Sequence, residues 1–589
     1  MIWQSIFFLV FLPLLFSPVL LIINKQKAKE ALALFAAFTA LFFSVLVFIN
    51  PPSALVLKVI GNYSVVLGVN NLSRFTMLFT CVFCFFTVLY SLGCRQVKSS
   101  RAFLSYLLAL LAFSNLVCLS LDFILLIFSW GACLILLYGL LSLGSGSSAN
   151  KAFSIVGFGD FCLLLGISLY VYLTGTSIMP IGPKVLLNSA VSWLSFGLML
   201  SGALAKAGCA PFHTWIPDAA DKAPVPVMAI LPASLDKLLG IYLLARICTD
   251  FFVLNNIAFA VLLITGSVTI MFAVMLAMAQ HDLRKLLSFH AISQVGYMVI
   301  GFGTGNILGI AAAVFHMLNN AIYKSGLFFT AGAAAEKKGT FELDKLGGLA
   351  LGMPFTFICG LVFALSISGV PPFNGFASKW MLYQSTLVGL SAATNPFMRI
   401  LLIFSLVAAM FGSVLTLASF VKFIHAIFLG QDHTPDKKVT TDSTLNILVS
   451  LIILAGLCLT LGVLPGLFIK IVIQPWLGEQ VLFIGTWNSA LTFALLAAGL
   501  MLGFIFWKIM LAGKKSRTDD LFIGGEDPQS FNPSFPATEF YRTFQQLPAV
   551  NAIFKFIQKE SLDFYNILSS GISKAAYFIA FLFNKGRQA

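Results

Sequence analysis

The sequence has 589 residues, of which 59% are apolar and only 10% are charged. A soluble domain carries about 25% charged residues, so the composition excludes an ordinary water-soluble protein and favours a membrane protein. The net charge of +14 does not indicate nucleic-acid binding, because the basic residues lie in short loops between apolar runs and form no basic face with interleaved aromatic residues.

The apolar runs predict an all-α polytopic membrane protein with about 14–16 transmembrane helices, since one helical span needs about 20 apolar residues. The predicted spans are residues 2–24, 30–50, 72–94, 101–120, 122–143, 152–174, 189–210, 225–247, 255–279, 284–304, 307–332, 352–390, 400–428, 444–468 and 484–511. A further apolar run, residues 565–584, is interrupted by Lys574, and the sequence leaves open whether it crosses the membrane.

Basic loop residues follow odd-numbered predicted spans, namely the first, third, fifth, ninth, eleventh, thirteenth and fifteenth. They are Lys25, Lys27, Lys29, Arg95, Lys98, Arg101, Lys151, Arg284, Lys285, Lys337, Lys338, Lys437, Lys438, Lys514, Lys515 and Arg517. Short loops rich in Lys and Arg stay on the cytoplasmic side of a membrane. The pattern therefore predicts a multi-pass protein of the cell (inner) membrane with its N-terminus outside.

Two predicted spans are interrupted by proline, and each break lies close to a lysine. Residues 206–215 read KAGCAPFHTW, and residues 369–380 read GVPPFNGFASKW. Pro211, Pro371 and Pro372 each remove a backbone donor, and such breaks persist at membrane depth only inside protein or beside a water-filled cavity. Matching breaks in two halves of a chain indicate a transporter built from inverted repeats.

The breaks and the change in composition near the C-terminus divide the chain into predicted parts. These are N-terminal transmembrane helices (1–100), a first repeat (101–250), a second repeat (251–430), C-terminal transmembrane helices (431–513) and a tail (514–589). The tail is polar at its start and contains Pro and Gly, so we expect a cytoplasmic, amphipathic surface element that ends in a candidate last transmembrane helix.

A row of polar residues lies inside the predicted spans, where an ionisable group costs a few kcal/mol or more unless it serves a pathway or a structural pair. The candidate ion-translocating residues are Lys206, Lys237, His290, His316, Asn320, Lys324 and Lys379, with Asp160 and Asp236 as candidate acidic partners. Burial brings the pKa of a lysine towards neutrality, and histidine titrates there already. The row therefore predicts translocation of protons or sodium ions.

Helical spacing relates some of these residues to one another. His316, Asn320 and Lys324 recur every fourth residue, so they share one helix face and form a polar file about 12 Å long. The alternative for Lys324 is that its ammonium group snorkels to the membrane surface. Asp236 and Lys237 are neighbours that point about 100° apart, so each needs a partner on another helix; a static structural pair is the alternative.

Three motifs resemble those of a known family. Residues 282–297 read DLRKLLSFHAISQVGY, residues 315–324 read FHMLNNAIYK, and the second break combines two prolines with Gly375 and Lys379. This pattern resembles the antiporter-like membrane subunits of respiratory complex I, of Mrp-type sodium/proton antiporters and of energy-converting nickel–iron hydrogenases. The resemblance implies two inverted five-helix repeats around a central axis of lysines and histidines.

The resemblance also implies roles for individual residues. Lys206 and Lys379 match the lysines of the two broken helices, and His316 and Lys324 match the helix that bridges the two repeats. Lys237 resembles the lysine of the helix after the first break but lies one residue early. That displacement turns its side chain by about 100°.

The sequence departs from the family pattern at one important position. The family usually has a glutamate after the tryptophan that corresponds to Trp130, whereas this chain has Gly131. The resemblance therefore leaves two possibilities: Asp160 or Asp236 replaces the missing carboxylate, or the first repeat has altered or lost pumping. Asn320 stands where the family has a second histidine, and it relays a proton through water but holds no charge.

The resemblance implies a coupling subunit that works with other membrane subunits and a partner oxidoreductase. The hydrogenase-type members match best, through His290, the Ala-Ser-Lys-Trp380 run and Gly-Gly-Glu526 in the tail. Iron–sulfur centres, with nickel–iron centres as an option, are expected in the partners. This chain is expected to bind no cofactor or metal and to perform no chemistry of its own, because Cys81 and Cys84 lack further ligands and no nucleophile–base set is present.

Two alternatives remain open from the sequence. The chain is a subunit of an Mrp-type sodium/proton antiporter driven by an ion gradient, or it is a structural spacer of the membrane arm that no longer pumps. The missing glutamate at Gly131 is the main argument for the spacer.

Overall fold

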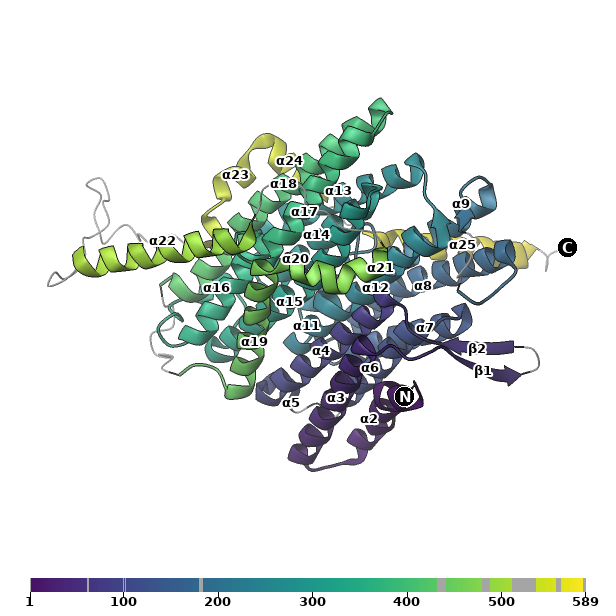
Figure 1. The fold of residues 1–589 in the computed structure, drawn as a ribbon, viewed down its shortest axis with the longest axis horizontal. Coiled ribbons are helices and arrows are strands. Elements are labelled where there is room, and N and C mark those ends of the chain that lie inside the picture. Colours follow the sequence, from purple (N-terminus) through teal and green to yellow (C-terminus); the bar gives the residue numbers. More distant parts are fainter. Residues whose placement is uncertain are drawn as a thin grey trace.

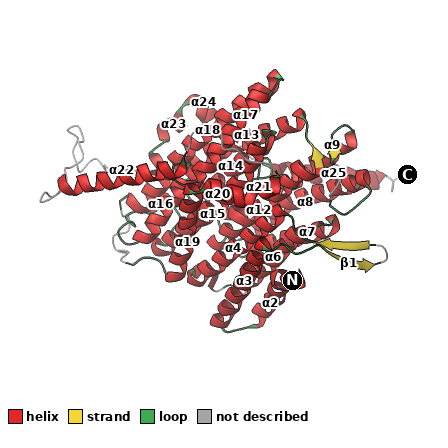
Figure 2. Cartoon of the chain, in the orientation of Figure 1, coloured by secondary structure: helices red, strands yellow, loops and turns green. Residues whose placement is uncertain are grey.

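The computed structural model describes residues 2–60, 63–98, 100, 102–179, 184–431, 441–478, 488–510, 537–557 and 563–585. Within these residues, 12 helices are long and apolar enough to cross a membrane, and shorter apolar helices cover Phe103–Leu119, Pro354–Ser368 and Pro465–Leu477. Figure 2 shows that strands are confined to two small pairs beside a body of helices. The fold is therefore that of an all-α polytopic membrane protein, as the sequence predicts.

The N-terminal part consists of helical spans and one β-hairpin. Its elements are α1 (Ile2–Ile6), η1 (Phe7–Phe11), α2 (Leu12–Ile22), α3 (Gln26–Ile49), β1 (Leu55–Ile60), β2 (Tyr63–Leu67), α4 (Asn71–Gly93) and α5 (Arg95–Lys98). The hairpin projects beyond the helices (Figure 1). It falls in a stretch between predicted spans, and its Val, Ile and Tyr residues favour an extended chain.

The part of the chain that the sequence predicts as the first repeat contains five consecutive spans, and the fourth is broken. The elements are α6 (Phe103–Leu119), α7 (Phe123–Ser142), α8 (Gly146–Thr174), β3 (Val185–Leu186), α9 (Ala190–Ala207), α10 (Trp215–Ala220), α11 (Val225–Ile230), η2 (Leu231–Leu235), α12 (Asp236–Arg246), η3 (Ile247–Phe251) and β4 (Phe252–Val253). α9 ends at Gly208, whose φ of 78° is left-handed and suits glycine. The break therefore follows Lys206 by two residues.

The second repeat has the same plan. Its elements are α13 (Asn256–Met278), α14 (Leu283–Gly303), α15 (Ile307–Lys338), η4 (Leu343–Lys345), α16 (Pro354–Ser368), α17 (Asn374–Ala392), α18 (Pro396–Ile424) and η5 (His425–Leu429). The break between α16 and α17 again interrupts the fourth span.

A close backbone approach joins α9 to α12. A Cβ atom at Gly240 would lie 2.6 Å from the backbone nitrogen of Ala207 and 2.9 Å from the carbonyl oxygen of Ala203. Only glycine fits at this distance. The contact places Lys206 near the first turn of α12, where Asp236 lies.

The C-terminal elements are α19 (Leu445–Val463), α20 (Pro465–Phe468), η7 (Ile469–Ile473), α21 (Gln474–Leu477), α22 (Ser489–Met510), η8 (Ala537–Glu539), α23 (Arg542–Gln546), α24 (Pro548–Ile557) and α25 (Phe564–Lys585). The predicted span 444–468 ends earlier, at Val463, because Pro465 begins a separate short helix. α22 extends away from the other helices (Figure 1), and α25 contains Lys574. The predicted cytoplasmic residues Lys437, Lys438, Lys514, Lys515 and Arg517, together with Glu526, lie outside the described residues.

Candidate functional site

The predicted polar residues form a buried row through both repeats. Each residue of this row has at most 2% of its surface exposed to solvent; the residues are Lys206, Asp236, Lys237, His290, His316, Asn320, Lys324 and Lys379. α9 and α12 supply the row in the first repeat, while α14, α15 and α17 supply it in the second. The bilayer core offers these groups no water, so each must find a partner inside protein or a hydrated path.

The acidic partner of Lys206 comes from the next helix. Lys206 Nζ lies 4.0 Å from Asp236 Oδ1, and both side chains are almost fully buried. The close approach at Gly240, one turn further along α12, allows this contact. Asp236 therefore faces Lys206 rather than its sequence neighbour Lys237, in agreement with their angular separation.

A second carboxylate, that of Asp160, is connected to Lys206 by Trp130, which contacts both residues. Trp130 Nε1 donates a 2.8 Å hydrogen bond to Asp160 Oδ1, and Lys206 Nζ lies 5.4 Å from the centre of a Trp130 ring. A Cβ atom at Gly131 would meet nothing within 4 Å, so this position leaves open space on α7. The structure thus places Asp160 and Asp236, from α8 and α12, around the lysine that would face a glutamate on α7.

The middle of the row contains cations that form no hydrogen bond within the described part of the chain. Neither Lys237 Nζ nor Lys324 Nζ has such a partner, and the same holds for both ring nitrogens of His290. Lys324 Nζ lies 5.5 Å from the Phe420 ring, whose centre is 4.9 Å from that of His290. Lys324 has no exposed surface, so its ammonium group does not reach the surface of the chain as snorkelling requires.

His316 lies in a hydrogen-bonded network between three helices. Its Nδ1 lies 2.9 Å from Ser378 Oγ on α17, and its Nε2 lies 3.1 Å from Gln294 Oε1 on α14. Tyr323 also donates to Gln294 Oε1, at 3.3 Å. Because a carbonyl oxygen only accepts, His316 donates through Nε2 and accepts through Nδ1. Nδ1 is therefore the atom at which this ring takes up a proton.

Lys379 uses the second helix break for its hydrogen bond. Its Nζ donates to the carbonyl oxygen of Ile367 at 2.8 Å and lies 4.8 Å from the centre of the Tyr297 ring. Ile367 lies in the last turn of α16, where carbonyl groups lack intrahelical partners. The break thus supplies an acceptor for a buried cation without a carboxylate.

The side chains that bind this row were not predicted from the sequence. Gln294 and Tyr297 follow His290 by four and seven residues, so helical spacing was the signal that could have found them. Lys422, near the end of α18, is 1% exposed and donates to the carbonyl oxygens of Met278 at 3.0 Å and Gln280 at 2.6 Å. Its place at the end of an apolar run concealed this burial.

Metal-ligating residues are scattered in the described part of the chain. No group of three or more His, Cys, Asp or Glu residues lies together there in a way that could hold a metal ion. Cys81 and Cys84 are free and buried in α4, and Cys81 Sγ lies 3.5 Å from the side chain of Asn115.

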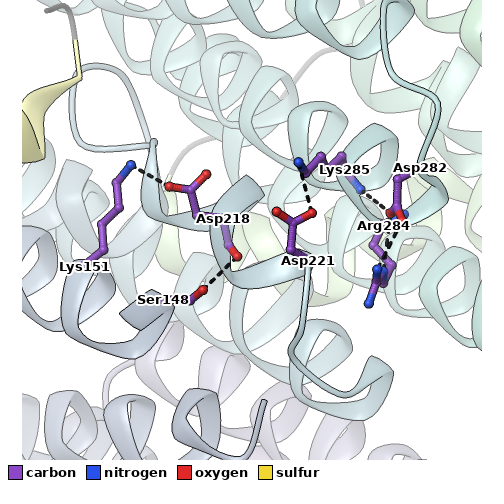
Figure 3. Close-up of polar contacts among 7 residues, drawn as sticks. All are labelled: Ser148, Lys151, Asp218, Asp221, Asp282, Arg284 and Lys285. Atoms are coloured by element: carbon purple, nitrogen blue, oxygen red, sulfur yellow. Dashed lines mark hydrogen bonds and ion pairs between the residues drawn. The ribbon is translucent and has the colours of Figure 1, made fainter. Parts of the chain in front are cut away.

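Ion pairs around α10 connect it to α8 and α14 (Figure 3). Lys151 of α8 binds Asp218 of α10 at 2.6 Å, and Lys285 of α14 binds Asp221, directly after α10, at 3.0 Å. The short helix that follows the first break is therefore held from both repeats.

The C-terminal tail also contacts the segment between the first break and α10. Asp563 forms an ion pair with Lys151, accepts a 2.7 Å hydrogen bond from Thr214 Oγ1 and accepts a 3.0 Å bond from the Tyr565 backbone N–H. The Phe564 ring packs against Phe212, with ring centres 4.9 Å apart. The start of α25 is thus docked on the segment that follows the first break.

Docking of the tail is expected to weaken in acid. Burial alone raises the pKa of Asp563, but the hydrogen bonds from Lys151, Thr214 and Tyr565 and the Lys151 charge outweigh burial and lower this pKa from 3.8. A lowered pKa in the docked state gives stability that is fully present above pH 3.8 and is lost as the pH falls through the lowered value. The protection of the amides at the start of α25, taken relative to the intrinsic exchange rate at each pH, should therefore fall below pH 3.8 in the wild type, whereas Asp563→Asn should show low protection at every pH. Equal profiles for the two would contradict the assignment.

Known proteins with similar sequences and folds include several membrane ion-transport subunits. The sequence profile of the family described as "NADH:quinone oxidoreductase/Mrp antiporter, TM" matches residues 120–408. The "Na(+)/H(+) antiporter subunit A1" of Staphylococcus epidermidis is 32% identical in an alignment 412 residues long, which covers 66% of this chain and 51% of the relative. This chain thus spans about half the length of the curated relatives that it matches.

Two solved structures share the fold. A chain of the membrane-bound sulfane sulfur reductase, described as an archaeal respiratory membrane complex, superposes with a TM-score of 0.82 at 24% identity and covers 98% of this chain and 95% of its own. A chain of respiratory complex I from Thermus thermophilus gives a TM-score of 0.67 at 19% identity and covers 81% of this chain and 98% of its own.

Proposed function

This chain belongs to the antiporter-like family of NADH:quinone oxidoreductase and Mrp antiporter membrane subunits, which its residues 120–408 match, and we propose that it translocates protons or sodium ions within a multi-subunit membrane complex. The observation that carries the proposal is the buried row from Lys206 to Lys379, which passes through both broken spans. Buried ionisable groups at this depth are kept mainly for pathways.

The row suggests how charge moves. In the first repeat, Asp236 and Asp160 stabilise a positive charge on Lys206. In the middle, Lys237 and Lys324 interact electrostatically, so a charge on one disfavours a charge on the other. A proton that arrives at one lysine therefore drives the next proton onward, and a change at one end of the row is felt at the other.

The driving reaction is proposed to be electron transfer in a partner oxidoreductase. The support is the fold match over nearly the full length of a chain from an archaeal respiratory membrane complex. Iron–sulfur centres, with nickel–iron centres as an option, would then lie in partner subunits. The second candidate is an Mrp-type antiporter subunit, which the 32% identity to a sodium/proton antiporter subunit favours.

A transport assay on the purified complex separates these candidates. The intact complex is reconstituted in vesicles that contain a pH indicator, and it receives either a chemical reductant such as reduced viologen or an imposed sodium gradient. If the subunit is redox-driven, protons should move when the reductant is added and should not move when only the sodium gradient is imposed. The opposite result supports the Mrp-type assignment. An intact complex that moves no ions under either condition contradicts both and leaves the structural spacer.

A further inference from the structure

Three hydroxyl groups from three helices meet beside Lys379. Tyr297 of α14 lies 3.0 Å from Ser413 of α18 through their hydroxyl oxygens, and Tyr383 of α17 lies 2.6 Å from the same Ser413 oxygen. The Ala409 carbonyl accepts from Tyr297 at 2.8 Å and from Ser413 at 3.1 Å. We call Tyr297, Ser413 and Tyr383 the hydroxyl cluster.

The hydroxyl cluster is in direct reach of the lysine of the second break. Lys379 Nζ lies 4.8 Å from the centre of the Tyr297 ring while it donates to the Ile367 carbonyl. A lysine side chain has four rotatable bonds, so its ammonium group can exchange the carbonyl for a hydroxyl of the cluster. Tyr383 lies one helical turn beyond Lys379 on α17.

A polar cavity lies further along the same helices. Its volume is about 200 Å³, and its polar lining includes Asn256, Thr304, Asn306 and Asn395. We call this cavity the vestibule. It lies at the ends of α14, α17 and α18 that the loop charges predict to face outside.

The distance between the hydroxyl cluster and the vestibule is short and follows from the rise of the helices. Along α14, Tyr297 precedes Thr304 by about 10 Å at 1.5 Å per residue, and along α17, Tyr383 precedes Gly389 by about 9 Å. The interval is polar: Ser385 and Thr386 are buried in it, and Asn306 donates to the Ser385 carbonyl at 2.9 Å.

We propose that the hydroxyl cluster and the vestibule form the outward half of the ion route from Lys379, and that this half carries protons rather than sodium ions. The proposal rests on the function proposed above. A proton leaves the Lys379 ammonium for the Tyr297 hydroxyl as Tyr297 passes its own proton to Ser413 and Ser413 passes one to Tyr383. Lys379 ends neutral, each hydroxyl gains and loses one proton, and Tyr383 releases one towards the vestibule.

The spacing of the oxygens supports protons over sodium. Protons pass between hydroxyl oxygens at hydrogen-bonding distance without movement of heavy atoms. A metal cation instead needs several oxygen ligands around it at once. The oxygens of the hydroxyl cluster bond to one another directly, at 2.6 and 3.0 Å, so no cation fits between them.

A purely structural pair on the same helix provides a matched control. Ser267 of α13 donates a 3.0 Å hydrogen bond to Ser405 of α18, and both are fully buried. Ser405 lies on α18 two turns from Ser413 but contacts α13 rather than Lys379 or the hydroxyl cluster. Ser405 lies between the vestibule residue Leu402 and Ser413 along α18, but its hydroxyl bonds to α13, so Ser405→Ala removes one buried hydroxyl at this depth without removing a group of the hydroxyl cluster.

The test compares proton release from vesicles that contain the intact complex. Ser413→Ala and Tyr383→Phe should each slow coupled proton release about a hundredfold, the usual contribution of a positioned proton-transfer group. The double variant should be no slower than the slower single variant, since both act in one route. Ser405→Ala should stay within about twofold of the wild type. Ser413→Thr, which restores the hydroxyl but adds a methyl group, should recover most of the rate, a result that a packing role does not predict.

The outcomes separate this inference from the function on which it rests. If Ser413→Ala and Tyr383→Phe both release protons normally while Lys379→Ala has lost proton release, the proposed route is wrong and the proposed function stands. Normal release in both Lys379→Ala and Lys324→Ala overturns the proposed function itself. Tracer sodium is followed in the same vesicles: proton release without sodium movement is expected, and sodium transport that Ser413→Ala abolishes would overturn the assignment to protons.

Discussion

Replacement of Lys379 by alanine is expected to abolish coupled ion transport while the complex still assembles. The ammonium group is the only one that links the second break to the hydroxyl cluster among the described residues, and its one hydrogen bond goes to a backbone carbonyl. Loss of the charge therefore removes a transfer site without leaving a buried opposite charge unpaired. Lys324→Ala should act in the same way, because Lys324 interacts electrostatically with both Lys237 of α12 and His290 of α14. Vesicle pH measurements on the purified complex give the readout.

A surface lysine provides the control for charge removal. Lys345 is exposed and pairs with Glu342 at 2.6 Å, so Lys345→Ala lowers the net charge equally but should leave transport unchanged. Subunit content by gel filtration should be normal in all three variants. Unchanged pumping in both Lys379→Ala and Lys324→Ala would exclude the buried row as the pathway.

The second large effect is expected on stability. Asp236→Ala should destabilise the chain by about 3–5 kcal/mol, because it leaves the ammonium of Lys206 buried without its ion-pair partner. Adding Lys206→Met should restore most of the loss, since the double variant has no unpaired charge. Thermal unfolding of the purified complex, followed across the four members of this cycle, measures the coupling.

The neighbouring carboxylate refines this experiment. Asp160→Ala should cost less than Asp236→Ala, because Asp160 reaches Lys206 through Trp130 and not by direct pairing. If the double variant Asp236→Ala/Lys206→Met is as unstable as Asp236→Ala alone, Lys206 and Asp236 do not stabilise each other. Equal losses for the two aspartates would show that they share the lysine charge evenly.

The sequence predicts the elements of this site better than their partners. A proline within seven residues of a lysine marked both broken spans. Proline breaks a helix where it stands, because it removes a backbone donor, so the break can be read from the local sequence. The shared face of His316 and Lys324 also follows from helix period alone. These features depend only on residues near one another in the chain.

Contacts between helices could not be predicted in the same way. The sequence left Asp160 and Asp236 as equal candidates, and the close approach of α9 and α12 at Gly240 makes Asp236 the direct partner of Lys206. Gln294 appears as one more polar residue until α14 packs against α15. Helix packing fixes such pairs, and one sequence without its relatives does not report it.

The difference between the two lysine environments has an electrical consequence. Lys206 shares its surroundings with two carboxylates, whereas Lys379 Nζ donates to a carbonyl, lies beside an aromatic ring and pairs with no carboxylate among the described residues. A charge that crosses the whole bilayer gains or loses about 2.3 kcal/mol for every 100 mV of membrane potential. Protonation of Lys379 creates a full uncompensated charge inside that field, while the charge of Lys206 is largely balanced by its neighbours. Voltage acts on a proton that enters either site according to the depth of the site, so the two lysines differ instead in what their deprotonation leaves behind: carboxylates without a counter-charge at Lys206, and no such group among the described partners of Lys379.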